Sequence, residues 1–96
     1  MAEDGFSREF ILVNPHGLHL RPASQFVSVA NRYSSQVYVS VDGGEEGNGK
    51  SILDLSCRAA EKGAVLRVRV VGEDAEDALS ELAELVEGGF GEMEGD

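Results

Sequence analysis

Two short segments of this chain alternate between apolar and polar residues, and this alternation limits the possible folds more than any other feature. In residues 36–41 (QVYVSV) valine occupies every second position, and in residues 65–71 (VLRVRVV) Arg67 and Arg69 lie opposite aliphatic side chains. Successive side chains of a strand point to opposite faces, so both segments predict strands with one apolar face. A doubly wound parallel sheet needs strands that are apolar on both faces. The pattern instead predicts a sheet that helices cover on a single side.

The remaining segments supply further strands and three helices around that sheet. Apolar spacing predicts a strand over residues 6–13, helices over 22–33, 51–60 and 74–87, and one short strand within the glycine-rich stretch 42–49. The resulting order is β-α-β-β-α-β-α. It predicts an α+β fold, a two-layer sandwich with the other face of the sheet exposed to water.

Each predicted helix begins with a residue suited to a helix start. Pro22 suits the first helical position, where the missing N–H is not needed. Ser51, with Asp54 three residues later, resembles a capping box. Asp74 is the expected cap of the last helix.

Composition and charge exclude several classes of function. The 96 residues form one domain, and 18 acidic residues against 8 Lys and Arg disfavour nucleic acid as a partner. No apolar stretch approaches about 18 residues, and the N-terminal residues are acidic, so we expect neither a membrane span nor a secretory signal. Cys57 is the single cysteine, which we expect to be a small buried helix residue. These features favour the cytoplasm, and residues 89–96 are expected to form a loose acidic tail.

Residues 44–51 (GEEGNGKS) fit the pattern of a phosphate-binding P-loop. A P-loop domain needs several parallel strands with helices on both sides of the sheet. Glu45 and Glu46 would also repel phosphate from inside such a loop. We therefore interpret the match as a coincidence in a glycine-rich turn, and we expect no cofactor and no metal.

Residues 14–24 (NPHGLHLRPAS) place His19 directly before a predicted helix, with Arg21 beside it. The first amides of a helix lack intrahelical partners, and the helix dipole makes that end electropositive. Arg21 adds donors that keep their charge, and a neutral imidazole is a nucleophile near pH 7. The segment can therefore accept a phosphoryl group on His19 and hold it. From the residues alone, a polar loop histidine beside a solvated arginine remains an equal alternative.

The sequence GLHLRPAS (residues 17–24) resembles the active-site signature of the HPr family, the histidine-containing phosphocarriers of the bacterial phosphoenolpyruvate:sugar phosphotransferase system. The likeness continues through GKSILDL (residues 49–55) and GEDAEDAL (residues 72–79), and so covers nearly the whole chain. It implies an open-faced sandwich over residues 1–88, in which three helices cover a four-stranded antiparallel sheet on one side. It further implies that enzyme I phosphorylates His19, that Arg21 supports the phosphate, and that sugar-specific IIA proteins receive it.

A carrier must bind and release its donor and its acceptor through one overlapping surface, so we expect a monomer with a small, transient interface. Leu20 stands where the family usually has Ala or Thr, and the helix after the site carries only Arg32 where relatives often have lysines. Partner contacts are therefore expected from a largely apolar set: Leu20, Phe26, Lys50, Ile52 and Leu53. His16 falls outside the signature histidine and is expected to be a turn residue.

Ser51 matches the serine that HPr kinase/phosphorylase modifies in many relatives. Two other functions stay open. The first is the regulatory, nitrogen-related branch of the family, in which the phosphorylation state is a signal. The second is a protein-binding module that has kept the fold and lost phosphoryl transfer, although intact His19 and Arg21 weigh against it.

Overall fold

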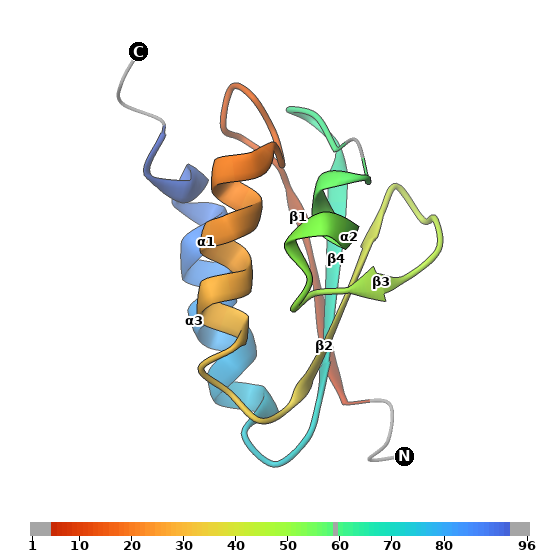
Figure 1. Cartoon of the computed structure of the whole chain (residues 1–96), viewed down its shortest axis with the longest axis vertical. Helices are drawn as coiled ribbons and strands as arrows, with labels where there is room; N and C mark the ends of the chain where they lie inside the picture. Colours follow the sequence, from red (N-terminus) through yellow and green to blue (C-terminus); the bar gives the residue numbers. More distant parts are fainter. Residues whose placement is uncertain (1–4, 59, 93–96) are drawn as a thin grey trace.

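The computed structural model describes residues 5–58 and 60–92 of the chain. The helices gather on one side of a sheet, where α1 and α3 pack side by side (Figure 1). The elements in chain order are β1 (Phe6–Ile11), α1 (Leu20–Ala30), β2 (Gln36–Val41), β3 (Gly47–Asn48), α2 (Ile52–Ser56), β4 (Val65–Val71), α3 (Ala75–Glu87) and the 3-10 turn η2 (Gly89–Gly91). In the described ranges, no helix is long and apolar enough to cross a membrane.

The four strands form one antiparallel sheet in the order β1-β4-β2-β3. β4 lies between β1 and β2, so that Val70 pairs with Phe6 on one side and with Val37 on the other. Strand β3 contributes only two residues at the edge. The predicted α+β open-faced sandwich is therefore confirmed, including the short strand within residues 42–49.

The alternation in the sequence corresponds to the two faces of this sheet. Val68 and Val70 are fully buried beneath the helices, whereas Arg69 lies on the opposite face. There its guanidinium stacks over the Tyr38 ring at 4.4 Å and forms two hydrogen bonds with Glu46, of 2.7 and 2.8 Å. The open face of the sheet is thus covered by paired polar side chains, and the core lies only on the helix side.

Several element boundaries differ from the predicted ones. Helix α1 begins two residues earlier than expected, so Pro22 occupies its third position rather than its first. This is tolerated because an amide in the first turn has no intrahelical partner to lose. Helix α2 ends at Ser56, four residues before its predicted end, and β1 ends at Ile11 rather than at residue 13.

Ser51 caps α2 as predicted, with its hydroxyl accepting the Asp54 N–H at 3.1 Å. The reciprocal half of the capping box is not formed. The Asp54 carboxylate instead accepts the Asn48 N–H at 2.9 Å and the Arg58 guanidinium at 2.8 Å. These two hydrogen bonds, the Asn48 bond first, lower the pKa of Asp54.

Asp74 stands directly before α3, but the prediction that its side chain caps this helix is wrong. Its carboxylate accepts hydrogen bonds from the Ser34 and Ser35 amides, both at 2.9 Å, and from both serine hydroxyls. The strongest effect is the Ser35 hydroxyl bond, and together these bonds lower the pKa of Asp74 to about 2. Asp74 therefore joins the segment before β2 to the start of α3.

Residues 89–92 differ from the expected loose tail. They follow α3 as the turn η2, in which the side chain of Phe90 is 3% exposed and packs into the core. Phe90 has a positive φ of 57°, and Gly89 and Gly91 on either side also have positive φ. Residues 93–96 of the expected tail lie outside the described residues.

We expect Asp74→Ala to destabilise the fold at pH 7 and to do so progressively less as the pH falls. An unfolded Asp titrates near pH 4. Because the pKa of Asp74 in the folded protein is lower, its carboxylate stabilises the fold fully only above about pH 4. The contribution is therefore lost between about pH 4 and pH 2. Urea unfolding at a series of pH values measures this. Asp77→Ala, which removes a carboxylate lacking a hydrogen bond among the described residues, is the control, and a pH-independent difference for Asp74→Ala would contradict the assignment.

We expect Phe90→Ala to lower the free energy of unfolding by about 3 kcal/mol, because a buried aromatic ring is replaced by a cavity. Chemical unfolding measures the change. Leu53→Ala is the matched control, since this side chain is 76% exposed and its loss should have little effect. If residues 89–92 were a loose tail, the two variants would unfold alike.

Candidate functional site

His19 stands immediately before α1, as predicted, in the N-cap position and with extended backbone. Its side chain is 40% exposed. A side chain at this position usually bonds the amide two or three residues on, but the His19 ring makes no capping bond. The third residue of the helix is Pro22, which has no N–H to offer. The imidazole is therefore available for other contacts.

The residues before His19 explain why its ring faces outward. Gly17 has a φ of 64°, and a Cβ there would lie 2.3 Å from the Ala60 carbonyl oxygen, so only glycine fits. Leu18 is buried, and its amide donates to the same carbonyl at 2.9 Å. The loop is thus held against the segment that follows α2, and the next side chain, His19, lies at the surface.

The start of α1 offers unpaired donors beside the ring. The Leu20 and Arg21 amides have no hydrogen-bond partner among the described residues, whereas the Ala23 amide already donates to the His19 carbonyl at 2.9 Å. The Arg21 side chain is 70% exposed. Free amides, the helix dipole and a guanidinium make this end of α1 suited to an anion.

A carboxylate from the other end of the chain completes this group of residues. Glu92 Oε2 lies 3.0 Å from His19 Nε2 and 3.8 Å from an Arg21 guanidinium nitrogen. The second oxygen, Oε1, accepts the Asn14 side-chain amide at 2.9 Å, and the Glu92 side chain is only 7% exposed. The site therefore includes two residues, Asn14 and Glu92, that the sequence did not indicate.

The surroundings of Glu92 favour its ionised form. Burial alone would raise the pKa of Glu92. Hydrogen bonds from Asn14 and His19, followed by the charges of His19 and Arg21, outweigh burial and hold the pKa below its usual range. The carboxylate is therefore negative at neutral pH.

His16 lies in a turn and is exposed, so the prediction for this residue is confirmed. Its ring meets the His19 ring edge to face, with 5.4 Å between the ring centroids. His16 is thus a neighbour of the site through ring packing.

The residues predicted to contact partners divide into two groups. Leu20, Ile52 and Leu53 are exposed apolar side chains on α1 and α2, and the two helices pack against each other. Phe26, however, is 1% exposed and belongs to the core, so its prediction as a contact residue is wrong. It lies on the apolar stripe that fastens α1 to the sheet.

Lys50 is only partly exposed, and its ammonium donates to the Tyr33 carbonyl at 2.7 Å, which joins the start of α2 to the end of α1. Cys57 is exposed, contrary to the prediction. Because α2 ends at Ser56, Cys57 falls in the turn beyond the helix rather than on its inner face.

The P-loop-like segment forms no nucleotide-binding loop in the described chain. Its residues Gly47 and Asn48 make strand β3, which pairs with β2 in an antiparallel sheet. The parallel strand–loop–helix arrangement that a P-loop requires is absent there. This agrees with the interpretation of the motif as a coincidence.

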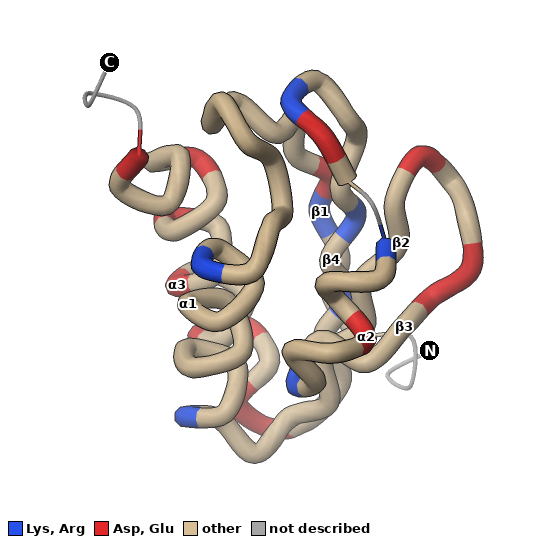
Figure 2. The backbone as a smooth tube through the Cα atoms, turned by 45° about the horizontal axis from the view of Figure 1, so that its top comes forward, with Lys and Arg blue, Asp and Glu red and all other residues tan. Residues whose placement is uncertain are grey.

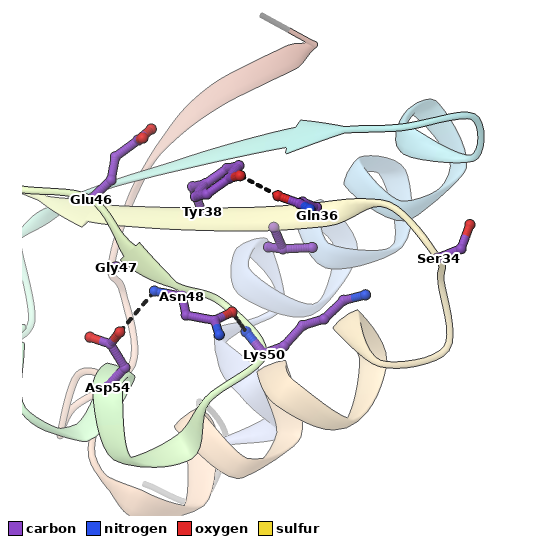
Figure 3. Close-up of a pocket in the computed structure, with 9 residues that line it drawn as sticks. Ser34, Gln36, Tyr38, Glu46, Gly47, Asn48, Lys50 and Asp54 are labelled. Atoms are coloured by element: carbon purple, nitrogen blue, oxygen red, sulfur yellow. Dashed lines mark hydrogen bonds between the residues drawn. The ribbon is translucent and has the colours of Figure 1, made fainter. Parts of the chain in front are cut away.

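A pocket of about 610 Å³ lies beside this segment, away from His19 (Figure 3). Its polar groups largely bind one another. The Asn48 amide donates to Asp54, and the Lys50 amide donates to the Asn48 side chain, each at 2.9 Å. The cavity is lined by Ser34, Gln36, Val37, Tyr38, Glu46, Gly47, Asn48, Lys50 and Asp54. It therefore shares no residue with the site at the start of α1.

Charge is unevenly distributed over the fold. Acidic residues occur along α3 and in the loop between β2 and β3, whereas basic residues are scattered, two of them, Arg67 and Arg69, on β4 (Figure 2). Among residues 5–58 and 60–92, no three His, Cys, Asp or Glu side chains come close enough to hold a metal ion. The chemistry available at the start of α1 is therefore that of an imidazole beside anion-binding donors.

Comparison with known proteins places this open-faced sandwich among the small phosphocarrier domains. The family model described as "PTS HPr component phosphorylation site" matches residues 6–88. A phosphocarrier protein HPr of Borreliella burgdorferi is 44% identical over 80 residues, which are 83% of this chain and 92% of that protein. The HPr of Pseudomonas aeruginosa is 41% identical over 86 residues, covering 90% and 96% of the two chains.

Longer relatives and solved structures agree with this assignment. A multiphosphoryl transfer protein of Salmonella typhimurium is 36% identical over 94 residues, 96% of this chain, but the match spans only 25% of that protein. The crystal structure of HPr-C-His from Thermoanaerobacter tengcongensis superposes with a TM-score of 0.85 at 34% identity, covering 91% of this chain and 97% of that one. The chain belongs to the HPr family, the phosphocarriers of the phosphotransferase system.

Proposed function

We propose that His19 is the residue that carries the phosphoryl group, receiving it from enzyme I and passing it to sugar-specific IIA proteins. One observation carries the proposal: an exposed imidazole stands at the start of α1, next to Arg21 and two unpaired amides. Such a position combines a nucleophile with preorganised donors for the phosphoryl oxygens.

The contacts of the ring indicate which nitrogen reacts. Nε2 faces the Glu92 carboxylate at 3.0 Å, and an ionised carboxylate can only accept a hydrogen bond. Nε2 therefore carries the proton, and the lone pair resides on Nδ1, which has no hydrogen-bond partner among the described residues. We assign Nδ1 of His19 as the phosphorylated atom.

The exposed apolar side chains Leu20, Ile52 and Leu53 are the contact surface that we propose for both partners. They lie on α1 and α2, the helix of the site and the helix packed beside it. Lys50 contributes through its stem, since its ammonium is bound to Tyr33. An apolar surface of this kind suits a carrier that exchanges partners without lasting ion pairs.

Incubation with enzyme I and phosphoenolpyruvate tests the proposal. We expect an acid-labile mass gain of one phosphate, present in the His16→Ala control and lost in His19→Ala. The two histidines are neighbours with similar exposure to solvent, so the comparison separates the reacting ring from the one packed against it. A gain that persists in His19→Ala, or none with any cognate enzyme I, would refute the assignment.

The same assay tests Arg21. We expect Arg21→Ala to slow phosphorylation about tenfold, since a charge-assisted hydrogen bond to the phosphoryl group is lost. Arg32→Ala is the matched control, because Arg32 lies at the opposite end of α1 and pairs with Glu81. Equal rates for the two variants would remove Arg21 from the site.

A regulatory function of Ser51 extends this proposal. Ser51 is partly exposed and directly precedes Ile52 and Leu53 of the proposed contact surface. A phosphate there would add about two negative charges to that apolar surface and so oppose the binding of partners. Incubation with HPr kinase/phosphorylase and ATP should give an acid-stable mass gain that Ser51→Ala lacks, and its absence would leave Ser51 as a helix cap only.

The regulatory, nitrogen-related alternative uses the same histidine, so the mass assay does not exclude it. A transport assay with IIA proteins separates it from sugar uptake. A module that has lost transfer would show no phosphorylation at all. We also propose a cytoplasmic location. The proposed partners, enzyme I and the IIA proteins, belong to the same phosphoenolpyruvate-dependent system as the carrier.

A further inference from the structure

The carboxylate of Glu92 is held on both of its oxygens. Oε2 lies 3.0 Å from His19 Nε2, and Oε1 accepts the Asn14 side-chain amide at 2.9 Å. Asn14 is fully buried, and the same amide nitrogen donates to the Gly17 carbonyl at 2.7 Å. The carboxylate is therefore attached to the loop that carries His19, and its orientation toward the ring is fixed.

We propose that Glu92 is a positioning residue for phosphoryl transfer, which holds His19 in the tautomer with a free Nδ1 lone pair and offsets the positive charge that the ring gains on phosphorylation. The inference rests on the proposed function of His19. It adds a residue from the C-terminal end of the fold that lies outside the signature GLHLRPAS.

The chemistry of the step shows what such a partner contributes. The Nδ1 lone pair forms the new bond to phosphorus, while the bond between phosphorus and the donor breaks and leaves its electron pair on the donor. No proton moves in this exchange. The ring then bears phosphorus on Nδ1 and hydrogen on Nε2, and so carries a positive charge. A carboxylate 3.0 Å from Nε2 stabilises that cation and retains the Nε2 proton.

The fold keeps this carboxylate in place through η2. Phe90 is 3% exposed and anchors the turn two residues before Glu92. Arg21 is farther from Glu92, at 3.8 Å, and its side chain is 70% exposed. The close contact of Glu92 is therefore with the ring, and the guanidinium remains free to turn toward a phosphoryl group on Nδ1.

The tautomer of His19 gives the first test. Nitrogen-15 NMR of the two ring nitrogens, recorded at alkaline pH, reports which one carries the proton. We expect Nε2–H to dominate in the wild-type protein and the Nδ1–H share to rise in Glu92→Ala. Glu87→Ala is the matched control, since it also removes a carboxylate near the end of α3, one that pairs with Arg8.

The rate of phosphoryl transfer gives the second test. With phosphorylated enzyme I in a single turnover, we expect Glu92→Ala to react about tenfold more slowly, which is the loss of one charge-assisted hydrogen bond. Glu92→Gln keeps the size of the side chain and removes its charge, and it should also be slow. Glu87→Ala should react at the wild-type rate. Thermal unfolding of each variant checks that the fold is retained. If Glu92→Ala destabilises η2, the rate of Glu92→Gln provides the test instead.

The outcomes separate this inference from the function on which it rests. If wild-type protein is phosphorylated on His19 and both Glu92 variants match it in rate and tautomer, the role of Glu92 is overturned and the carrier function stands. If the wild-type protein accepts no phosphoryl group, the carrier function fails, and Glu92 loses its role with it.

Discussion

The packing of β4 at the centre of the sheet is the constraint on which the rest of the structure depends. Its aliphatic side chains are fully buried on one face, and its arginines face the other way. All three helices must therefore lie on a single side. With α1 and α3 side by side in opposite directions, the start of α1 and the end of α3 meet at the same end of the molecule (Figure 1). Residues far apart in the chain, His19 and Glu92, come into contact there.

The sequence predicts well those features that follow from short-range periodicity. The strands Gln36–Val41 and Val65–Val71 match their predicted ranges because alternation defines a half-buried strand over its whole length. His19 precedes α1 as expected. The prediction of Phe26 as a partner-contact residue was wrong. Its helical spacing places it on the buried stripe of α1, and a side chain there is not available to a partner.

Contacts between distant segments could not be read in the same way. Glu92 lies in an acidic stretch whose composition is typical of a solvated tail, and the burial of Phe90 and the hydrogen bonds of Glu92 show that the chain is held there. Asp74 has the residue type and position of a cap, yet the Ser34 and Ser35 amides compete successfully for its carboxylate. Both cases depend on tertiary neighbours that no local pattern reveals.

The sheet order also has a consequence for how the chain acquires its structure. Both long partners of β4 precede it, and β1 pairs with it across some sixty residues of sequence. A chain emerging from a ribosome exposes β1 first but cannot pair it until β4 has been synthesised. Such non-local pairing slows folding, because the entropy of closing a long loop must be overcome first. The sheet is therefore completed only once β4, its last strand in chain order, has been synthesised.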